Sequence, residues 1–147
     1  MTHPRSWNAY RQITTQTASP GQLVLMLYDG ALQFLQKALV GFELEDPGQA
    51  NETINNNIIR AQSILQELNG TLNLEAGGRL AETLRGLYEY MDDRLMEANM
   101  RKSPDGVRET LRRLTVIRDA WSEMLRQHVH ASGSEAMPAS LSLCACV

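Results

Sequence analysis

The sequence is poor in cysteine and in long apolar runs. Its only two cysteines among 147 residues, Cys144 and Cys146, are separated by one residue, too close to cross-link distant parts of a fold. The longest apolar run, Leu23 to Tyr28, has six residues, whereas a membrane-spanning helix needs about 20. Residues 1–8 lack the apolar segment of a secretory signal. We therefore expect no structural disulfide, no membrane insertion and a location in the cytosol.

Positive charge is also scarce. Fourteen Lys and Arg residues against 17 Asp and Glu residues give a net charge of -3, which argues against a protein that binds nucleic acid by neutralising phosphates. Arg108, Arg112, Arg113 and Arg118 are interleaved with acidic residues. This segment therefore predicts a solvated helix face instead of a basic patch.

Groups suited to catalysis or metal binding are few. The three histidines, His3, His128 and His130, all lie toward the ends of the chain. Neither Glu-x-x-His pairs nor a glycine-rich phosphate loop occur, and His128 and His130 near Glu123 lack the further ligands of a structural metal site. The ending Cys144-Ala145-Cys146-Val147 has the form of a prenylation box, but without basic residues upstream an inert tail is favoured. We expect no enzyme, no cofactor and no metal.

Three short segments share the pattern of a helix start. They are Ser19-Pro20-Gly21-Gln22, Asp46-Pro47-Gly48-Gln49 and Ser103-Pro104-Asp105-Gly106. A Ser or Asp side chain can cap free backbone N–H groups, and proline suits the first helical position because it has no N–H to leave unpaired. Gln22 and Gln49 stand where a capping box places Glu or Gln. A fourth, weaker start has Asn73 as the cap.

Between these starts, apolar residues recur with helical spacing. The stripes are Ala50, Ile54, Ile58, Ala61, Leu65, Leu68 and Leu72; Leu80, Leu84, Leu87, Met91, Leu95 and Ala98; and Val107, Leu111, Leu114, Ile117, Trp121 and Leu125. From Pro20 to Leu44 only a narrow strip is polar, so this helix should be covered by more than one neighbour. The sequence predicts an all-α, antiparallel four-helix bundle over residues 19–130. A cap segment over residues 1–18, with a short helical stretch, precedes it, and a flexible tail over residues 131–147 follows.

Some apolar residues fall outside the stripes. At about 100° per residue, Ile59 lies opposite its stripe, Met96, Met100 and Val116 lie well off theirs, and Ile64 and Met124 lie at stripe edges. Flexible, polarizable methionine side chains suit a surface that accepts an apolar partner helix. Scattered surface residues or a wider core would give the same pattern.

The order and spacing of several motifs resemble those of the FliS family of flagellin export chaperones, over roughly residues 5 to 127. The matching motifs are Asn8-Ala9-Tyr10, Ala18-Ser19-Pro20-Gly21-Gln22-Leu23, Met26-Leu27-Tyr28-Asp29-Gly30-Ala31, Ala61-Gln62-Ser63-Ile64-Leu65-Gln66-Glu67-Leu68, Gly77-Gly78, Leu87-Tyr88-Glu89-Tyr90-Met91, Ala98-Asn99 and Ala120-Trp121. The resemblance implies a small helical bundle in the bacterial cytosol, a monomer or weak homodimer. It would bind the C-terminal segment of flagellin, prevent premature filament polymerisation and aid delivery to the flagellar type III export apparatus.

The resemblance also implies a role for the N-terminal segment, which in the family can lie over the client groove and contributes to docking on the export gate. In this chain Trp7 and Tyr10 would take that role, although Trp7 stands where other members often have an aliphatic residue. For the flagellin groove we expect contributions from Ile59, Ile64, Met96 and Met100. The alternative is a helical adaptor or regulatory bundle that self-associates through the same apolar surface.

Overall fold

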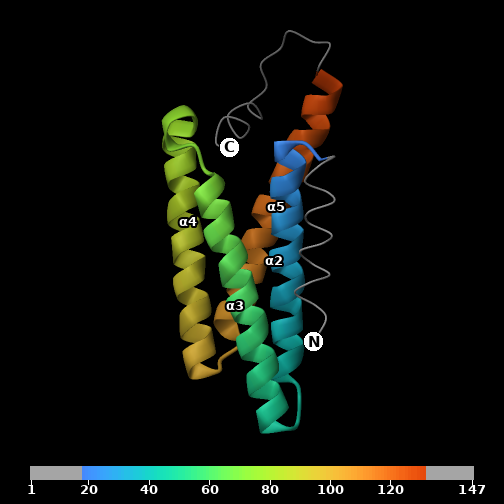
Figure 1. Ribbon diagram of the computed structural model, residues 1–147, viewed down its shortest axis with the longest axis vertical. Helices are drawn as coiled ribbons and strands as arrows, with labels where there is room; N and C mark the ends of the chain where they lie inside the picture. Colours follow the sequence, from blue (N-terminus) through green and yellow to red (C-terminus); the bar gives the residue numbers. More distant parts are fainter. Residues whose placement is uncertain (1–17, 132–147) are drawn as a thin grey trace.

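A computed structural model describes residues 18–131, which form four helices and contain no strand. In chain order they are α2 (Pro20–Phe42), α3 (Pro47–Thr71), α4 (Leu74–Arg101) and α5 (Asp105–Ala131). Helix α2 packs against α3 and α5, and α4 packs against the same two helices. Successive helices run in opposite directions (Figure 1). The predicted antiparallel four-helix bundle is confirmed, while the boundaries of the flanking segments remain a prediction.

The predicted helix starts occur, with one shift. The Ser19 hydroxyl accepts from the backbone N–H of Gln22, whose side chain accepts from the backbone N–H of Ser19, which completes a capping box. The carboxylate of Asp46 accepts from the backbone N–H of Gln49, and Asn73 caps α4. Helix α5 begins at Asp105, one residue later than the sequence pattern predicts.

The core is built from the predicted stripes and from α2. Its largest fully buried side chains include Trp121, Tyr28, Leu35, Ile58, Leu65, Leu68, Met91, Leu95 and Leu114. Trp121 of α5 meets the ring of Tyr28 edge-on at 6.2 Å between centroids and donates its indole N–H to the backbone oxygen of Gly21, at 2.9 Å. The Tyr28 hydroxyl is hydrogen-bonded to that of Tyr88. These contacts join α2 to both α5 and α4.

Helix α2 differs from one sequence-based expectation. By length and composition alone it could cross a membrane, although the longest apolar run did not indicate this. The mean hydropathy of α2 is high because Leu, Val, Met, Phe and Ala recur along the whole helix between a few polar residues. The same composition is found in core helices of soluble proteins, and Val24, Leu27, Ala31, Leu35 and Ala38 of α2 are buried in the bundle.

Two glycines give a matched test of helix packing. A Cβ at Gly106 would lie 2.7 Å from the backbone oxygen of Arg94, because α5 crosses α4 closely there. A Cβ at Gly86, inside α4, would meet nothing within 4 Å. We expect Gly106→Ala to lower the free energy of unfolding by about 1–3 kcal/mol, and Gly86→Ala to raise it by about 0.5–1 kcal/mol. Urea denaturation would measure the free energy of unfolding of both variants. Equal changes in the two variants would contradict the close approach of α5 to α4 at Gly106.

Candidate binding surface

The line where α3 meets α4 carries two polar contacts between the helices. The Asn99 side-chain amide donates to Oδ1 of Asn55 at 2.9 Å, and the Gln62 amide donates to the backbone oxygen of Asp92 at 3.4 Å. Since the two helices are antiparallel, these pairs fix their register. Residue 59 of α3 is therefore level with residues 95 and 96 of α4.

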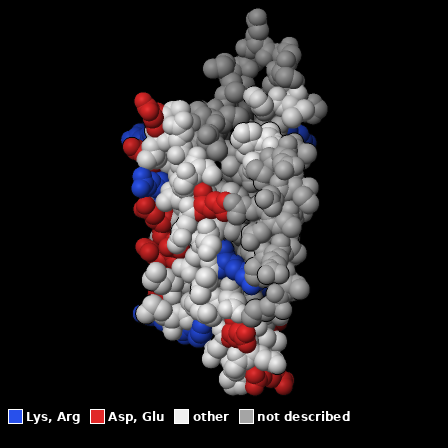
Figure 2. Space-filling view, in the orientation of Figure 1, with Lys and Arg blue, Asp and Glu red and all other residues white. Residues whose placement is uncertain are grey.

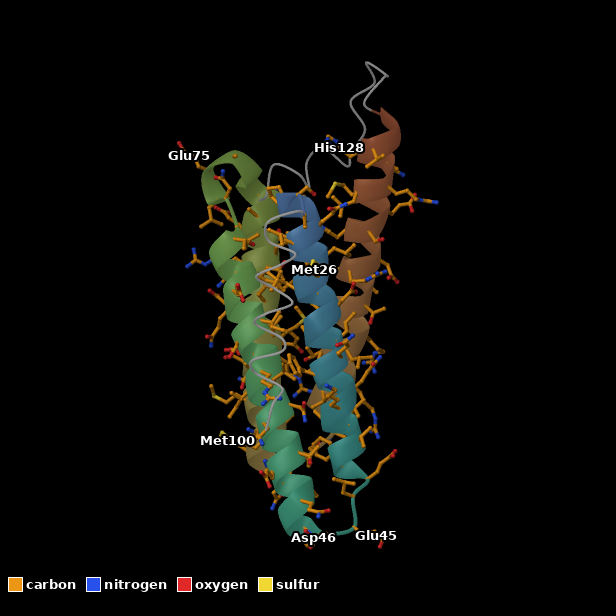
Figure 3. The ribbon with its side chains drawn as sticks, turned by 45° about the vertical axis from the view of Figure 1, so that its right-hand side comes forward. Met26, Glu45, Asp46, Glu75, Met100 and His128 are labelled. Carbon is orange, nitrogen blue, oxygen red and sulfur yellow. The ribbon has the colours of Figure 1, made fainter. Side chains whose placement is uncertain are left out.

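Three apolar side chains lie exposed along this line. The exposed fraction is 48% for Ile59, 51% for Met96 and 79% for Met100. Met100 follows Met96 by one helical turn, and Ile59 follows Asn55 by one turn, so all three lie on the outer side of the α3–α4 contact. Figure 3 shows Met100 at the side of the bundle, away from α5. We call Ile59, Met96 and Met100 the seam patch.

Ile64, the fourth predicted groove residue, lies elsewhere. Its side chain is only 4% exposed and belongs to the core. One turn earlier on α3, the guanidinium of Arg60 lies 5.7 Å from the ring centre of Phe34 on α2, so this side of α3 faces α2 instead of α4. A part for Ile64 in client binding would require the α2–α3 contact to open. Met124 is buried too, whereas Val116 is exposed on α5, apart from the seam patch.

Asp92 places a carboxylate in the same seam. Its Oδ1 atom is buried and has no hydrogen-bond partner. Burial raises the pKa of Asp92; the nearby amide of Gln62 offsets part of this effect, and the negative charge of Asp93 adds to it. The fold therefore disfavours the charged form of a group that is ionised at neutral pH in the unfolded chain.

This burial makes Asp92→Asn a stabilising change. Because the pKa is raised in the folded chain, the stability that Asp92 contributes is full below its unfolded pKa and is lost as pH rises through the folded pKa. At pH 7 we expect Asp92→Asn to raise the free energy of unfolding by about 1 kcal/mol. The gain in the free energy of unfolding should disappear in acid, where the protonated Asp92 of the unmodified chain is uncharged, as the asparagine of the variant is. Denaturant titrations at several pH values would show this, with exposed Asp93→Asn as the matched control; a gain independent of pH would contradict the assignment.

The contact between α4 and α5 carries a second, more polar cluster. The Tyr90 hydroxyl donates to Oε2 of Glu109 at 2.7 Å, and the Nε atoms of Arg94 and Arg113 lie 3.5 and 3.4 Å from the same oxygen. The Tyr90 hydrogen bond and both arginines lower the pKa of Glu109. These contacts favour the charged form of Glu109 and join α4 to α5.

No metal site is formed by the residues that the structure describes, since no three His, Cys, Asp or Glu side chains come together there. Trp7 and Tyr10, predicted to contact the groove or the export gate, lie outside the described residues, as does the cysteine-bearing end of the chain. The seam patch is the feature that sequence analysis and structure share. A helical bundle with an exposed apolar surface defines a class of protein that works by binding.

Comparison with known proteins places the chain within this class. The family profile described as Flagellar protein FliS matches residues 3–128. The chain is 38% identical over 130 residues to the flagellar secretion chaperone FliS of Bacillus subtilis, covering 86% of this chain and 93% of that protein. It is 34% identical to the chaperones of the same description from Salmonella typhimurium, covering 79% and 87% of the two chains, and Campylobacter jejuni, covering 81% and 90%. The chain belongs to the FliS family.

Proposed function

We propose that this protein is a flagellar export chaperone that binds the C-terminal segment of flagellin, prevents its premature polymerisation and aids its delivery to the flagellar type III export apparatus. Membership of a family of flagellar secretion chaperones supports the general role. The observation that carries the specific proposal is the seam patch, three exposed apolar side chains on two packed helices. Neighbouring apolar side chains that are exposed to water often mark a surface that a partner covers.

The chemistry of the patch suits an unfolded client. A disordered segment that folds as it binds loses conformational entropy, so apolar contacts must compensate for its ordering. Met96 and Met100 have flexible, polarizable side chains that adapt to differently shaped apolar residues. Three side chains alone cover little area, so the seam patch would be one part of a longer contact.

The proposal is tested by titrating a peptide of the flagellin C-terminal segment into the full chain in a calorimeter. We expect saturable binding with a negative heat-capacity change, the signature of buried apolar surface. Flagellin lacking this segment is the control and should not bind. In a light-scattering assay, the chain should also delay filament growth of intact flagellin. Failure of the peptide to bind would overturn the proposal.

We also propose that the N-terminal segment, through Trp7 and Tyr10, covers the client surface in the free protein and contributes to contact with the export gate. If the segment competes with the client, deleting residues 1–18 removes a competitor, and we expect the same peptide to bind several-fold more tightly. Calorimetry on the full and the shortened chain measures this difference. Equal or weaker binding by the shortened chain would count against a covering role.

The proposed chaperone would act in the bacterial cytosol as a monomer or weak homodimer, without a cofactor. The alternative is an adaptor that self-associates through the seam patch. Sedimentation without client separates the two functions. An adaptor should form a defined oligomer that Met96→Asp disrupts, whereas a chaperone should remain mainly monomeric.

A further inference from the structure

The end of α4 and the first part of α5 carry an excess of positive charge. From Arg94 to Arg113 the chain has six Lys and Arg residues against three Asp and Glu residues. In residues 18–93 and 114–131 the balance is reversed, with six basic and 13 acidic residues. Since α4 packs against α5 and only three residues join them, the six positive charges lie in one corner of the bundle. We call this surface the basic corner; its cations are Arg94, Arg101, Lys102, Arg108, Arg112 and Arg113.

Two of the three carboxylates in the basic corner are each shared between two arginines. Glu97 lies 3.2 Å from Arg94 and 3.5 Å from Arg101. The Oε2 atom of Glu109 lies 3.5 Å from Arg94 and 3.4 Å from Arg113. Two negative charges therefore meet three positive charges, and these contacts leave positive charge uncompensated.

The other three cations are compensated even less. Arg108 lies 3.6 Å from Asp105, but both side chains are more than half exposed, and such a pair contributes little. Lys102 contacts the side chain of Asn99 instead of a carboxylate. Arg112 is exposed and forms no ion pair with any residue from 18 to 131. A negatively charged partner would supply the carboxylates that this part of the chain lacks.

The packing of the two helices produces this excess. The sequence of α5 alone predicts a solvated face, because its arginines alternate with acidic residues. In the bundle, α5 crosses α4 so closely that a Cβ at Gly106 would lie 2.7 Å from the backbone oxygen of Arg94. The basic residues at the end of α4 therefore add their charge to that of α5.

An aromatic ring borders the basic corner. Tyr90 is 42% exposed, and the guanidinium of Arg113 lies 5.3 Å from the centre of its ring. The Tyr90 hydroxyl donates to Glu109. These contacts hold Tyr90 and Arg113 in place before binding, which reduces the entropy that a partner's binding would cost. Tyrosine and arginine are also the residue types enriched where proteins bind other proteins.

The charges around the basic corner favour a narrow partner. The α2–α3 connection carries Glu43, Glu45 and Asp46 and lies at the same end of the bundle as the α4–α5 connection (Figure 1, Figure 3). Figure 2 shows Lys and Arg side chains at the lower end of α4, apart from acidic side chains at the bottom of the bundle. A flat anionic membrane or a long nucleic acid would bring its phosphates close to both regions. A short acidic segment can contact the basic corner alone.

We propose that the basic corner binds an acidic segment of a partner protein, whose carboxylates contact Arg108 and Arg112 on the exposed face of α5. These arginines are four residues apart, about 6 Å along the helix axis. A helix with glutamates four residues apart presents carboxylates at the same spacing. The corner lies along α4 and α5, whereas the seam patch lies along α3 and α4. The inference therefore goes beyond flagellin binding and adds a second site, for a partner that can bind together with a client.

The test uses two synthetic helical peptides that differ only in carrying glutamate or glutamine at four-residue spacing, titrated into the full chain by fluorescence anisotropy. We expect the glutamate peptide to bind at least about tenfold more tightly at a salt concentration of about 0.05 M, with a smaller difference at about 0.5 M. The double substitution Arg108→Gln, Arg112→Gln should weaken the glutamate peptide several-fold and leave the glutamine peptide unchanged.

A matched control removes the same charge from the opposite end of the bundle. Arg79 of α4 and Arg126 of α5 are exposed there, so Arg79→Gln, Arg126→Gln lowers the net charge equally and should affect the glutamate peptide much less. Both double variants should keep their helical circular dichroism. Equal affinity of the two peptides, or equal losses in the two double variants, would overturn the inference.

Three other occupants are outcomes of the same test. A short DNA duplex or vesicles of anionic phospholipid might replace the peptide as ligand; tighter binding of either, lost in Arg108→Gln, Arg112→Gln, would overturn the choice of an acidic protein segment. Self-association of the free chain in sedimentation, abolished by the same variant, would make a second copy the occupant and overturn it too.

Met96→Asp separates this inference from the proposed function. It should weaken the flagellin C-terminal peptide and leave the glutamate peptide nearly unchanged, because Met96 belongs to the seam patch. If the flagellin peptide binds and the glutamate peptide shows no preference over its glutamine partner, the chaperone function stands and the second site fails. If only the glutamate peptide binds, the second site stands and flagellin is not the client.

Discussion

Replacing Ile59 and Met96 together by aspartate is expected to weaken binding of the flagellin C-terminal peptide by at least about 100-fold. Each change removes apolar contact at the centre of the seam patch and requires a new carboxylate to lose water beneath the bound segment. Both new charges would also lie beside Asp92, whose pKa burial already raises. Calorimetry with the full chain measures the loss.

The controls separate a local effect from a general one. Both side chains are about half exposed, so the double variant should keep its helical circular dichroism and unfold in one transition. Val116→Asp adds a charge at an exposed apolar residue on α5, 70% exposed and apart from the patch, and should bind the peptide like the unmodified chain. Unchanged affinity of the double variant would remove the seam patch from the client site.

The largest effect on stability is expected at Trp121. Trp121→Ala should lower the free energy of unfolding by about 3–5 kcal/mol, a large part of the stability of a domain of this size. The indole is 2% exposed, meets the ring of Tyr28 and donates to the backbone oxygen of Gly21. Its loss leaves a cavity between α2 and α5 and an unpaired acceptor near the start of α2. Urea denaturation followed by circular dichroism measures the change.

Two further substitutions divide this effect into its parts. Trp121→Phe keeps an aromatic ring but not the donor, so an intermediate loss is expected, of about 1–3 kcal/mol. Val116→Ala, on the exposed side of the same helix, should change the free energy of unfolding by less than about 0.5 kcal/mol. A loss at Trp121→Ala no larger than that at Val116→Ala would show that the α2–α5 contact contributes little.

Most of the fold could be predicted from the sequence because its signals are local. A capping residue such as Ser19 acts on backbone groups within the next turn, and apolar periodicity follows from helix geometry alone. The one-residue error at α5 arose because two residues, Ser103 and Pro104, both suit a helix start. The backbone oxygen of Pro104 accepts from the backbone N–H of Arg108 at 2.9 Å, so Pro104 takes the cap position and the helix begins at Asp105.

The binding surface was harder to predict because exposure depends on neighbouring helices. Ile59 and Ile64 both lie away from the centre of the α3 stripe, but on opposite sides of it. The side of Ile64 is covered by α2, and the side of Ile59 is left open next to α4. The position of a residue in a helix gives the direction of its side chain around the helix axis. Only the packed bundle shows which of these directions a neighbouring helix covers.

Asp92 could not have been identified from the sequence. It is one of two adjacent aspartates, and its position in the helix does not show whether its carboxylate is buried or solvated. Its buried oxygen and its raised pKa result from the contact between α3 and α4. A wheel projection would have placed it at the stripe edge, together with residues that are ordinary solvated side chains.

The contact of α2 with α5 has a consequence during synthesis. The indole of Trp121 reaches back 100 residues to Gly21, so the most apolar helix leaves the ribosome first and gains its final neighbour last. At about 5–20 residues per second, the intervening stretch takes on the order of 5–20 s to make. Through that interval α2 can pack against α3 and α4 but not against α5, so part of its apolar surface stays open to aggregation until the last helix has been made.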